Sequence, residues 1–269
     1  MGMKDNILIK LNSCFNDYMF YETEHYYTHR GNRVKSSVTQ FIGTKHKSFD
    51  KDKMSAYVAK RDNRSQEEVL KDWDNAAKLS CNVGTLFHLR SEQLANNKTF
   101  EIDYRAYQQL EFFDLMKDRL TKLIPMQDEF FRDIHNKLIP IKTEFTVGYK
   151  DIIAGNIDLL AWNEKDQEFQ IWDYKTNKDI KTENKYQKLL DEFNFLDDCE
   201  LNKYSIQLGI YKDLLERALD IQIGKCYLAW FNENNDSYKI FKCLDLKESI
   251  HHCLDNLIRK EEINGNNTN

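Results

Sequence analysis

The chain has 269 residues, of which 41% are hydrophobic and 31% charged, and its net charge at pH 7 is -5. This length accommodates one large domain with an attached helical lobe, and the mean hydropathy of -0.71 indicates a soluble globular protein. No run of about 18 apolar residues occurs, which argues against a membrane span. The negative charge argues against a protein that coats DNA stoichiometrically.

The N-terminus and the cysteines both point to a cytoplasmic protein. The segment from Met1 to Asn6 lacks the charged start and the apolar core of a signal peptide. The six cysteines include no Cys-x-x-Cys pair, so we expect reduced thiols and no iron–sulfur cluster. Frequent Asn, Lys and Ile residues suggest an AT-rich genome. We therefore expect the cytoplasm of a bacterial or phage-infected cell.

The first part of the chain predicts a β-hairpin followed by a short helix. Tyr26–His29, the turn residues Gly31 and Asn32, and Val34–Val38 have the pattern of two short paired strands. Ser37–Gln40 then has the sequence of a capping box, which satisfies backbone N–H groups at the start of a helix.

Longer helices are predicted between residues 50 and 137, where they form a helical lobe. A second capping box at Ser65–Glu68 begins one of them, and Gly84 interrupts its apolar spacing before the helix resumes. Another helix is expected over Tyr104–Leu123 and ends near Pro125, because proline lacks the N–H that a helix needs. A short helix over Met126–Asn136 completes the lobe.

The second half of the chain predicts strands interrupted by helices. We expect strands over 138–149, 152–162 and 167–174, a helix over 204–218, strands over 225–231 and 238–243, and a last helix over 246–259. This order predicts an α/β or α+β fold in which helices flank a central mixed β-sheet. We divide the chain into an N-terminal hairpin and helical lobe (1–137), a core (138–263) and a disordered tail (264–269), with the first two forming one integrated domain.

Two carboxylates and a lysine are brought together by the strands on either side of the turn at Asn163–Gln167. Asp173 and Lys175 are two residues apart in one strand, so their side chains share a face of the sheet. If the hairpin folds about its middle, Asp158 lies directly opposite Asp173, at roughly 5 Å between Cβ atoms. Two anions this close repel each other unless a cation lies between them. A divalent metal ion, with Lys175 beside it to meet a phosphate, suits the hydrolysis of a phosphodiester.

The pattern of Gly155, Asp158, Asp173 and Lys175 resembles the PD-(D/E)XK nuclease superfamily. The apolar strand residues around the two aspartates are similar to the RecB-like exonuclease branch in particular. A softer similarity to phage exonucleases and to the mitochondrial genome maintenance exonuclease group covers most of the chain. The resemblance implies a restriction-endonuclease-like core with a central mixed β-sheet, flanked by helices and joined to the N-terminal helical lobe.

Two further motifs of the RecB-like branch occur in the expected order. Gly84-x-x-x-His88 resembles its upstream helical histidine motif, and Gln207-x-x-x-Tyr211 resembles its downstream helix. Gln207 and Tyr211 lie on one helix face because they are four residues apart. The resemblance implies that this face lies beside the site, where it contacts DNA or braces Lys175.

The resemblance also implies a site for Mg²⁺ or Mn²⁺, since hard oxygen ligands suit these ions. Asp158 and Asp173 would hold the metal, the backbone carbonyl of Tyr174 would complete the set, and His88 matches a helical histidine ligand. Lys175 would orient the attacking water and stabilise charge on the phosphoryl oxygens. Taken alone, His88 would be a packed helix histidine and Lys175 a surface partner of Asp173.

Three other residues are weaker candidates. Glu144 could face Asp158, as a ligand of a second metal ion or as a group that contacts the metal ligands, or it could be an exposed strand glutamate, and the sequence leaves these interpretations open. Lys178 and Lys181 belong to a lysine-rich segment directly after the motif. Their charge alone favours a solvated loop, but their place next to the site favours contact with DNA.

The leading hypothesis is a Mg²⁺- or Mn²⁺-dependent deoxyribonuclease that acts in DNA replication, recombination or repair. The resemblance favours an exonuclease on single-stranded DNA or DNA ends. The alternatives are a structure-specific endonuclease on the same core and a catalytically inactive DNA-binding module. A nucleotide-cofactor enzyme is disfavoured because no glycine-rich phosphate loop is present. We expect a monomer that binds DNA and no membrane, with recombination or replication proteins as partners.

Overall fold

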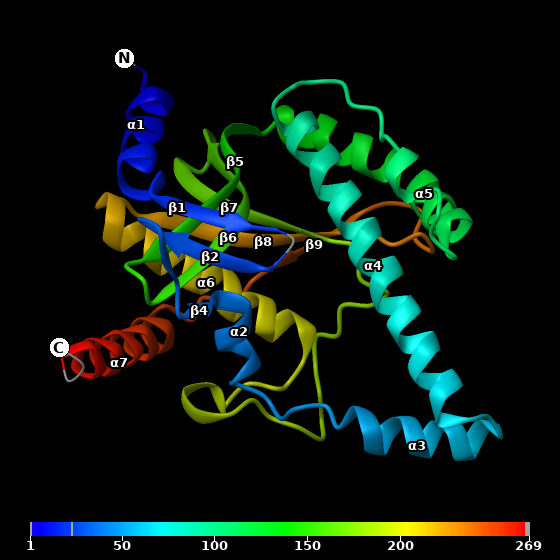
Figure 1. Ribbon diagram of the computed structural model, residues 1–269. Coiled ribbons are helices and arrows are strands. Elements are labelled where there is room, and N and C mark those ends of the chain that lie inside the picture. The colour runs from blue at the N-terminus through cyan, green and yellow to red at the C-terminus, as the bar shows by residue number, and fades with distance from the viewer. Residues whose placement is uncertain (1, 23, 267–269) are drawn as a thin grey trace.

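The computed structural model describes residues 2–22 and 24–266, and Figure 1 shows their arrangement. The helices are α1 (Met3–Phe15), α2 (Val38–Gly43), α3 (Lys51–Asp62), α4 (Gln66–Ala95), α5 (Phe113–His135), α6 (Glu200–Leu219) and α7 (Lys247–Asn266), with 3₁₀ turns at Arg105–Tyr107 and Asp191–Phe193. The strands are β1 (Tyr18–Tyr21), β2 (Tyr26–His29), β3 (Asn32–Arg33), β4 (Ser36–Ser37), β5 (Leu138–Tyr149), β6 (Ile153–Asn163), β7 (Glu168–Lys175), β8 (Ile223–Trp230) and β9 (Lys239–Lys242). No helix in this described part of the chain is long and apolar enough to cross a lipid bilayer.

The central sheet is mixed, as the sequence predicts. Among the described residues it has six strands in the order β4-β6-β7-β8-β9, and β5 also pairs with β6. The β7–β8 and β4–β6 pairs are parallel, whereas the β5–β6, β6–β7 and β8–β9 pairs are antiparallel. A smaller sheet, β1-β2-β3, precedes it in the chain.

The two faces of the central sheet enter separate hydrophobic cores. Leu160 and Ile171 belong to a core shared with α1, α2, α6 and α7. Their strand neighbours Leu159 and Trp172 belong to a second core, formed with α4 and α5. This alternation follows from the two-residue period of a strand. Helices therefore cover both faces of the sheet (Figure 1), and the restriction-endonuclease-like α/β arrangement expected from the sequence is confirmed.

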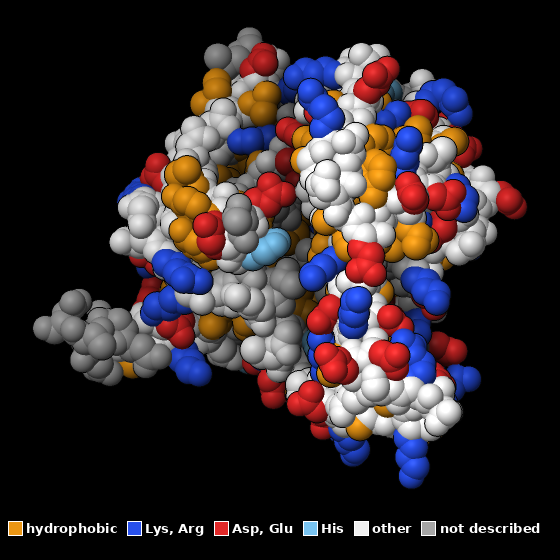
Figure 2. Space-filling model, turned by 45° about the vertical axis from the view of Figure 1, so that its right-hand side comes forward, with side chains coloured by type: hydrophobic (Ala, Val, Ile, Leu, Met, Phe, Trp, Pro, Cys, Tyr) orange, Lys and Arg blue, Asp and Glu red, His pale blue; other side chains and the backbone are white. Residues whose placement is uncertain are grey.

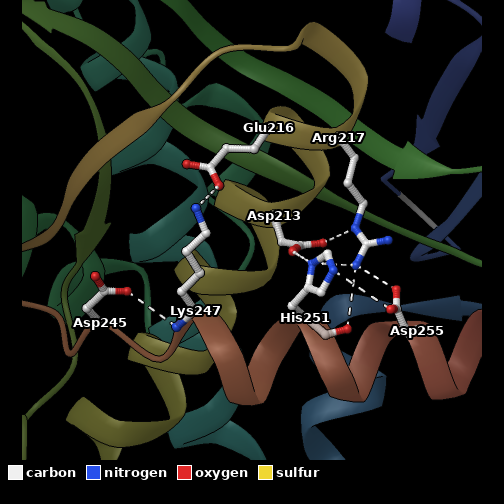
Figure 3. A network of polar contacts seen from close by, with 7 residues as sticks. All are labelled: Asp213, Glu216, Arg217, Asp245, Lys247, His251 and Asp255. Carbon is white, nitrogen blue, oxygen red and sulfur yellow. Dashed lines mark hydrogen bonds and ion pairs between the residues drawn. The ribbon is translucent and has the colours of Figure 1, made fainter.

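A polar network fastens α7 along α6 (Figure 3). Arg217 lies between Asp213 and Asp255, bonded to the first through Nε and to the second through Nη2 at 2.8 Å. Lys247 Nζ lies 3.2 Å from a carboxylate oxygen of Glu216. Single surface ion pairs contribute little to stability, but groups that share one arginine hold their helices in a defined register. The network helps to fix α6, which borders the candidate site.

The helix end expected near Pro125 does not occur, and the interruption of the apolar pattern at Gly84 does not break its helix. α4 continues through Gly84, and α5 continues through Pro125. A glycine in a helix interior costs about 0.5–1 kcal/mol and a proline about 3 kcal/mol. Both helices bury an apolar stripe in the second core, with Val83 and Phe87 on either side of the glycine and Leu123 before the proline. Burial of these stripes outweighs the local penalties.

The start of the helix expected from Tyr104 is also wrong. The backbone N–H of Arg105 donates to Asp103 Oδ1 at 3.0 Å, which favours a turn instead. A 3₁₀ turn over Arg105–Tyr107 follows, and the helix begins at Phe113.

Both ends of the chain differ in detail from expectation. β2 of the predicted hairpin pairs with Asn32–Arg33 rather than with the segment after them, and β1 pairs on its other side. The capping box at Ser37 is present and begins α2. At the C-terminus, α7 extends to Asn266, so residues 264–266 of the expected disordered tail are helical. Residues 267–269 lie outside the described residues.

Candidate active site

The site lies where β6 and β7 separate. β5 pairs with β6 along its whole length, so β4 and β7 must share the other edge of β6. On that edge β4 pairs with Ile153 and Ala154, and the ladder to β7 begins only at Leu159. The segment 155–158 therefore faces a gap between two partner strands. Asn156 and Asp158 of this segment border the cavity that the gap leaves open.

Asp158 and Asp173 occupy the first facing positions beyond the β6–β7 ladder. The last ladder pair is Leu159 with Trp172, and each aspartate is the next residue on its strand. Asp158 Oδ2 accepts the backbone N–H of Tyr174 at 2.7 Å, so a side chain takes the place of a strand carbonyl. Burial raises the pKa of Asp158 above its ordinary value, although the positive charges nearby oppose this shift.

The buried Asp173 forms an ion pair with the half-buried Lys175. Asp173 Oδ2 lies 2.5 Å from Lys175 Nζ, and that nitrogen also lies 4.9 Å from the centre of the Tyr204 ring. Burial lowers the pKa of Lys175, but Asp173 and Asp158 raise it above its ordinary value, so the side chain stays an ammonium. Burial raises the pKa of Asp173 to about 6 against the opposing effect of Lys175. The pair thus presents a fixed positive charge next to an acidic centre.

His88 reaches these strands from the middle of α4. Its Nε2 lies 3.1 Å from the carbonyl oxygen of Tyr174, and its Nδ1 lies 3.3 Å from Glu144 and 3.5 Å from Asp158. Burial would lower the pKa of His88, but Asp158 and Glu144 outweigh it and raise the pKa to about 9. The two carboxylates therefore create a negative field that favours a cation at this point.

Glu144 enters the site through an unusual backbone geometry. It lies inside β5 between the pairs that Thr143 and Phe145 make with β6, yet its φ is 42°. This left-handed conformation costs a residue other than glycine about 1–2 kcal/mol. Such strain persists only where the surroundings hold it, and it gathers at functional sites. Of the alternatives that the sequence left open, the structure has the Glu144 carboxylate beside His88 rather than in solvent.

The donor atoms gathered here fit a hard divalent cation. One ligand atom each from His88, Glu144 and Asp158 lie within 4.8 Å of one another. The Tyr174 carbonyl oxygen borders the same group through its contact with His88. Carboxylate and carbonyl oxygens suit Mg²⁺ or Mn²⁺. The raised pKa of His88 reflects the same local preference for positive charge. Asp173 lies outside the group of three and faces Lys175.

α6 closes the opposite side of the site through Gln207 and Tyr211. Gln207 Nε2 donates to the Tyr211 hydroxyl at 3.0 Å. The Tyr211 ring packs directly on the backbone of Gly155, where an added Cβ would lie 2.6 Å from Tyr211 Cε1. The glycine that precedes Asp158 and the Gln-x-x-x-Tyr helix are thus two sides of one contact. This contact joins the two motifs in the folded protein.

These residues line a single cleft of about 880 Å³. Seven of the residues singled out from the sequence border it: His88, Glu144, Asp158, Asp173, Lys175, Gln207 and Tyr211. Lys178 and Lys181 do not border it; both are exposed on the segment after β7, and Lys181 borders a separate pocket. Figure 2 views the side of the helical lobe, where acidic and basic side chains are interspersed rather than sorted into one basic surface.

Phe20, Tyr27, Glu92 and Tyr107 are among the other residues that line the cleft. Phe20 and Tyr27 come from the small sheet, and their rings stack with centres 4.7 Å apart. Glu92 lies one helical turn after His88, so the four-residue period of α4 could have found it. Tyr107 comes from the 3₁₀ turn, for which no local pattern points to the site.

Comparison with known proteins agrees with this geometry. The model of the PD-(D/E)XK nuclease superfamily matches residues 55–252. One similar solved structure is described as "Putative exonuclease" from Eubacterium rectale, with 14% identity, a TM-score of 0.33, and coverage of 82% of this chain and 71% of that chain. Another is the protein SSO0001, with 13% identity, a TM-score of 0.25, and coverage of 65% and 85%. No curated protein matches the sequence.

The family match is the decisive finding among these comparisons, because both TM-scores are too low to carry an argument. The matched segment spans more than half of the chain. It includes α4, β6, β7 and α6, which all bring side chains to the cleft. It contains His88, Asp158 and the Asp173–Lys175 pair. The protein therefore belongs to the PD-(D/E)XK nuclease superfamily and is a hydrolytic nuclease.

Proposed function

We propose that this nuclease hydrolyses DNA with the help of Mg²⁺ or Mn²⁺ and acts as an exonuclease on single strands or DNA ends, in replication, recombination or repair. One observation carries the proposal. The ligand atoms of His88, Glu144 and Asp158 converge within 4.8 Å of one another in the cleft that also holds the Asp173–Lys175 ion pair. A cation site and a half-buried ammonium side by side match the two needs of phosphodiester hydrolysis: charge stabilisation and orientation of the attacking water.

The metal would be held by His88, Glu144 and Asp158, with Asp173 and the Tyr174 carbonyl as further oxygen donors. When bound, the ion supplies positive charge that stabilises the phosphoryl oxygens during the reaction. His88 comes from the region 1–137 and the other ligands from 138–263. We therefore propose that these two regions form one integrated domain.

Lys175 acts directly on the substrate in this proposal. Its ammonium is fixed by Asp173 at 2.5 Å and lies against the Tyr204 ring, so it has little freedom to turn away. Its raised pKa keeps it protonated at neutral pH, which excludes a role as general base. It orients the attacking water and contacts a phosphoryl oxygen through its remaining N–H groups.

An exonuclease mode is favoured by the resemblance to RecB-like exonucleases and by the walls of the cleft. The stacked Phe20 and Tyr27 rings on one side and Tyr107 on another offer apolar surfaces to unpaired bases. A structure-specific endonuclease on the same core is the second candidate. It shares the catalytic residues and differs in whether a free end is needed.

The test is a time course with end-labelled linear DNA and circular single-stranded DNA, in Mg²⁺, in Mn²⁺ and in EDTA. We expect hydrolysis of the linear strand in either metal, none in EDTA, and an intact circle. Lys175→Ala should abolish hydrolysis, while the matched variant Lys165→Ala, on the exposed turn between β6 and β7, should not change it.

Each other outcome contradicts a defined part of the proposal. Cleavage of the circle would replace the exonuclease by an endonuclease. Activity in EDTA, or full activity of Lys175→Ala, would refute the metal-dependent site. Binding of DNA without any turnover would indicate an inactive binding module.

A further inference from the structure

A second cavity borders α6, the helix that also lines the active-site cleft, and has no role in the proposal above. It has a volume of about 640 Å³. One wall is formed by residues 46–54, from the connection between α2 and α3 and the first turn of α3. The other is formed by residues between 181 and 203, from the connection between β7 and α6 and the first turn of α6. Both walls continue from elements that line the cleft, since Thr39 belongs to α2 and Lys175 ends β7.

α6 shows how close the two cavities are. Lys203 borders the second cavity, and Gln207 and Tyr211 border the cleft. These three residues follow one another at intervals of four, so they lie on one face of the helix. Lys203 and Gln207 are separated by one turn, or about 6 Å along the axis. Since stacked nucleotides rise about 3.4 Å each, a strand that leaves the cleft along α6 reaches the cavity within about two nucleotides.

The two walls are held together rather than merely adjacent. Lys45, at the start of the first wall, pairs with Asp191 at 3.1 Å and with Glu192 at 2.8 Å. The backbone N–H of Leu190 donates to the Lys45 carbonyl at 2.8 Å. Lys45 is buried, whereas Asp191 is largely exposed, so the contact is shielded from solvent on the Lys45 side only. The cavity therefore has a defined shape.

The side chains in the cavity carry free positive charge. Lys47, Lys53 and Lys181 all border it, and within the described residues none of them has a carboxylate oxygen within 4 Å. Most other lysines near this surface are paired, as Lys203 is with Asp198 at 3.1 Å. Asp50, Asp198 and Glu200 also border the cavity; Asp198 is paired with Lys203, and the Asp50 carboxylate accepts the backbone N–H of Lys53 at the start of α3. The four lysines of the cavity thus outnumber its three carboxylates by one, which leaves a small local excess of positive charge in a chain whose net charge is -5.

An exposed aromatic ring lies among these lysines. Phe49 is 65% exposed, and its ring contacts Trp73 of α4 with the ring centres 5.8 Å apart. The tilted contact with Trp73 holds the ring in place while leaving much of it open to solvent. An exposed ring next to unpaired lysines is the combination by which proteins bind single-stranded nucleic acid: bases stack on the ring, and phosphates meet the cations.

We propose that this cavity binds the part of a single DNA strand that continues beyond the active-site cleft, with Phe49 stacking on a base and Lys47, Lys53 and Lys181 contacting phosphates. The inference rests on the proposed nuclease function. A duplex does not fit this chemistry, because its bases are paired and stacked and leave no face for Phe49. The cavity thus favours single-stranded over duplex substrate at a distance from the scissile bond.

Binding is measured in the Asp173→Asn background, with a fluorescent single strand of about 20 nucleotides, a trinucleotide and a duplex of the same length. Phe49→Ala should weaken binding of the long strand at least fivefold and leave the trinucleotide unaffected, because stacking of one base has about that effect. Phe49→Trp keeps an aromatic face and should restore binding. The matched control is Tyr57→Ala, an equally exposed aromatic on α3 that does not border the cavity, and it should have no effect.

The lysines are tested by salt dependence. The double variant Lys53→Ala/Lys181→Ala should reduce the slope of log K against log salt by about 1.4, since each phosphate contact with a single strand contributes about 0.7. Lys60→Ala, on the exposed side of α3, is the control and should leave the slope unchanged.

The outcomes separate this inference from the proposed function. If Phe49→Ala binds the long strand as well as its parent, or if Tyr57→Ala loses as much, the cavity is not a strand-binding site. If Phe49→Ala weakens the duplex equally, the preference for single strands is wrong. Absence of hydrolysis by the unmodified protein with Mg²⁺ or Mn²⁺ would refute the nuclease proposal alone, because the binding measurements need no turnover.

Discussion

Replacing Gly155 by alanine should destabilise the protein, although the change adds only one methyl group. A Cβ at this position would lie 2.6 Å from Cε1 and 2.9 Å from the hydroxyl oxygen of Tyr211. The Tyr211 ring is buried, and its hydroxyl accepts a hydrogen bond from Gln207, so it cannot turn away cheaply. Either the ring or the strand that carries Asp158 must shift.

The expected magnitude follows from the cost of overpacking a buried contact, which is about 1–3 kcal/mol. For a chain of this size each kcal/mol lowers the Tm by about 2–4 °C, so the loss is about 2–12 °C. Gly84→Ala is the matched control. Gly84 lies in the interior of α4 with nothing within 4 Å of an added Cβ, so alanine should raise the free energy of unfolding by about 0.5–1 kcal/mol. The same glycine-to-alanine substitution should therefore lower the free energy of unfolding at position 155 and raise it at position 84.

The assay is urea unfolding followed by fluorescence and circular dichroism, with EDTA present to remove any contribution of metal binding. Both variants lose the same conformational freedom in the unfolded state, so their difference isolates the contact with Tyr211. The double variant Gly155→Ala/Tyr211→Leu should lose less stability than the sum of the two single variants, because the smaller side chain relieves the overlap. If Gly155→Ala is as stable as Gly84→Ala, the close packing of Tyr211 on β6 is wrong.

Two further predictions concern pH. The pKa of His88 is about 9 in the folded protein against 6.5 ordinarily, so its contribution to stability is complete below about pH 6.5 and is lost as the pH rises through 9, by about 3 kcal/mol at most. Urea unfolding in EDTA should show this loss, and His88→Gln should remove it. His88 must lose its proton to bind a metal ion, so calorimetry should find Mn²⁺ binding weakened as the pH falls through about 9. The pKa of Asp173 is about 6, which should add a second loss of Mn²⁺ affinity with its onset near pH 6. Lys175→Ala should move that onset to higher pH, because Lys175 lowers the pKa of Asp173; an unchanged onset would contradict the ion pair.

Much of the site could be predicted because its parts follow local rules. The alternation of strand residues puts Asp173 and Lys175 on one face, and the short turn after β6 sets the register that brings Asp158 opposite Asp173. The four-residue helical period likewise brings Gln207 and Tyr211 together, and the structure has them hydrogen-bonded. Such relations depend on spacing along the chain and need no knowledge of the tertiary structure.

The remaining features depend on contacts between distant segments. α5 passes through Pro125 because its buried stripe outweighs the proline, a balance that no local pattern reveals. The requirement for glycine at Gly155 comes from a tyrosine 56 residues later in the chain. α1 was missed for another reason. Ile7, Leu11 and Phe15 recur at helical spacing and are all buried, so the signal was present in the sequence.

The backbone conformation of Glu144 could not be predicted from the sequence either. Nothing in the sequence around it indicates a φ of 42°, because a glutamate inside a strand is normally extended. In the structure this conformation aims its carboxylate at His88, while the flanking residues keep their pairing with β6. The strained backbone is therefore part of how β5 contributes to the metal site, and its cost should be measurable apart from the carboxylate.

Glu144→Ala and Glu144→Gly make that separation, because both remove the carboxylate and only glycine relieves the strain. Lys242→Ala and Lys242→Gly, at an exposed position of β9, are the control pair. At such an ordinary strand position the glycine variant should be less stable than the alanine variant by about 0.5–1 kcal/mol. At position 144 the order should reverse, with glycine more stable than alanine by about 1 kcal/mol in urea unfolding with EDTA. Both variants should lose Mn²⁺ affinity equally in calorimetry. If alanine is the more stable at both positions, Glu144 is not held in a strained conformation, and its contact with His88 needs another explanation.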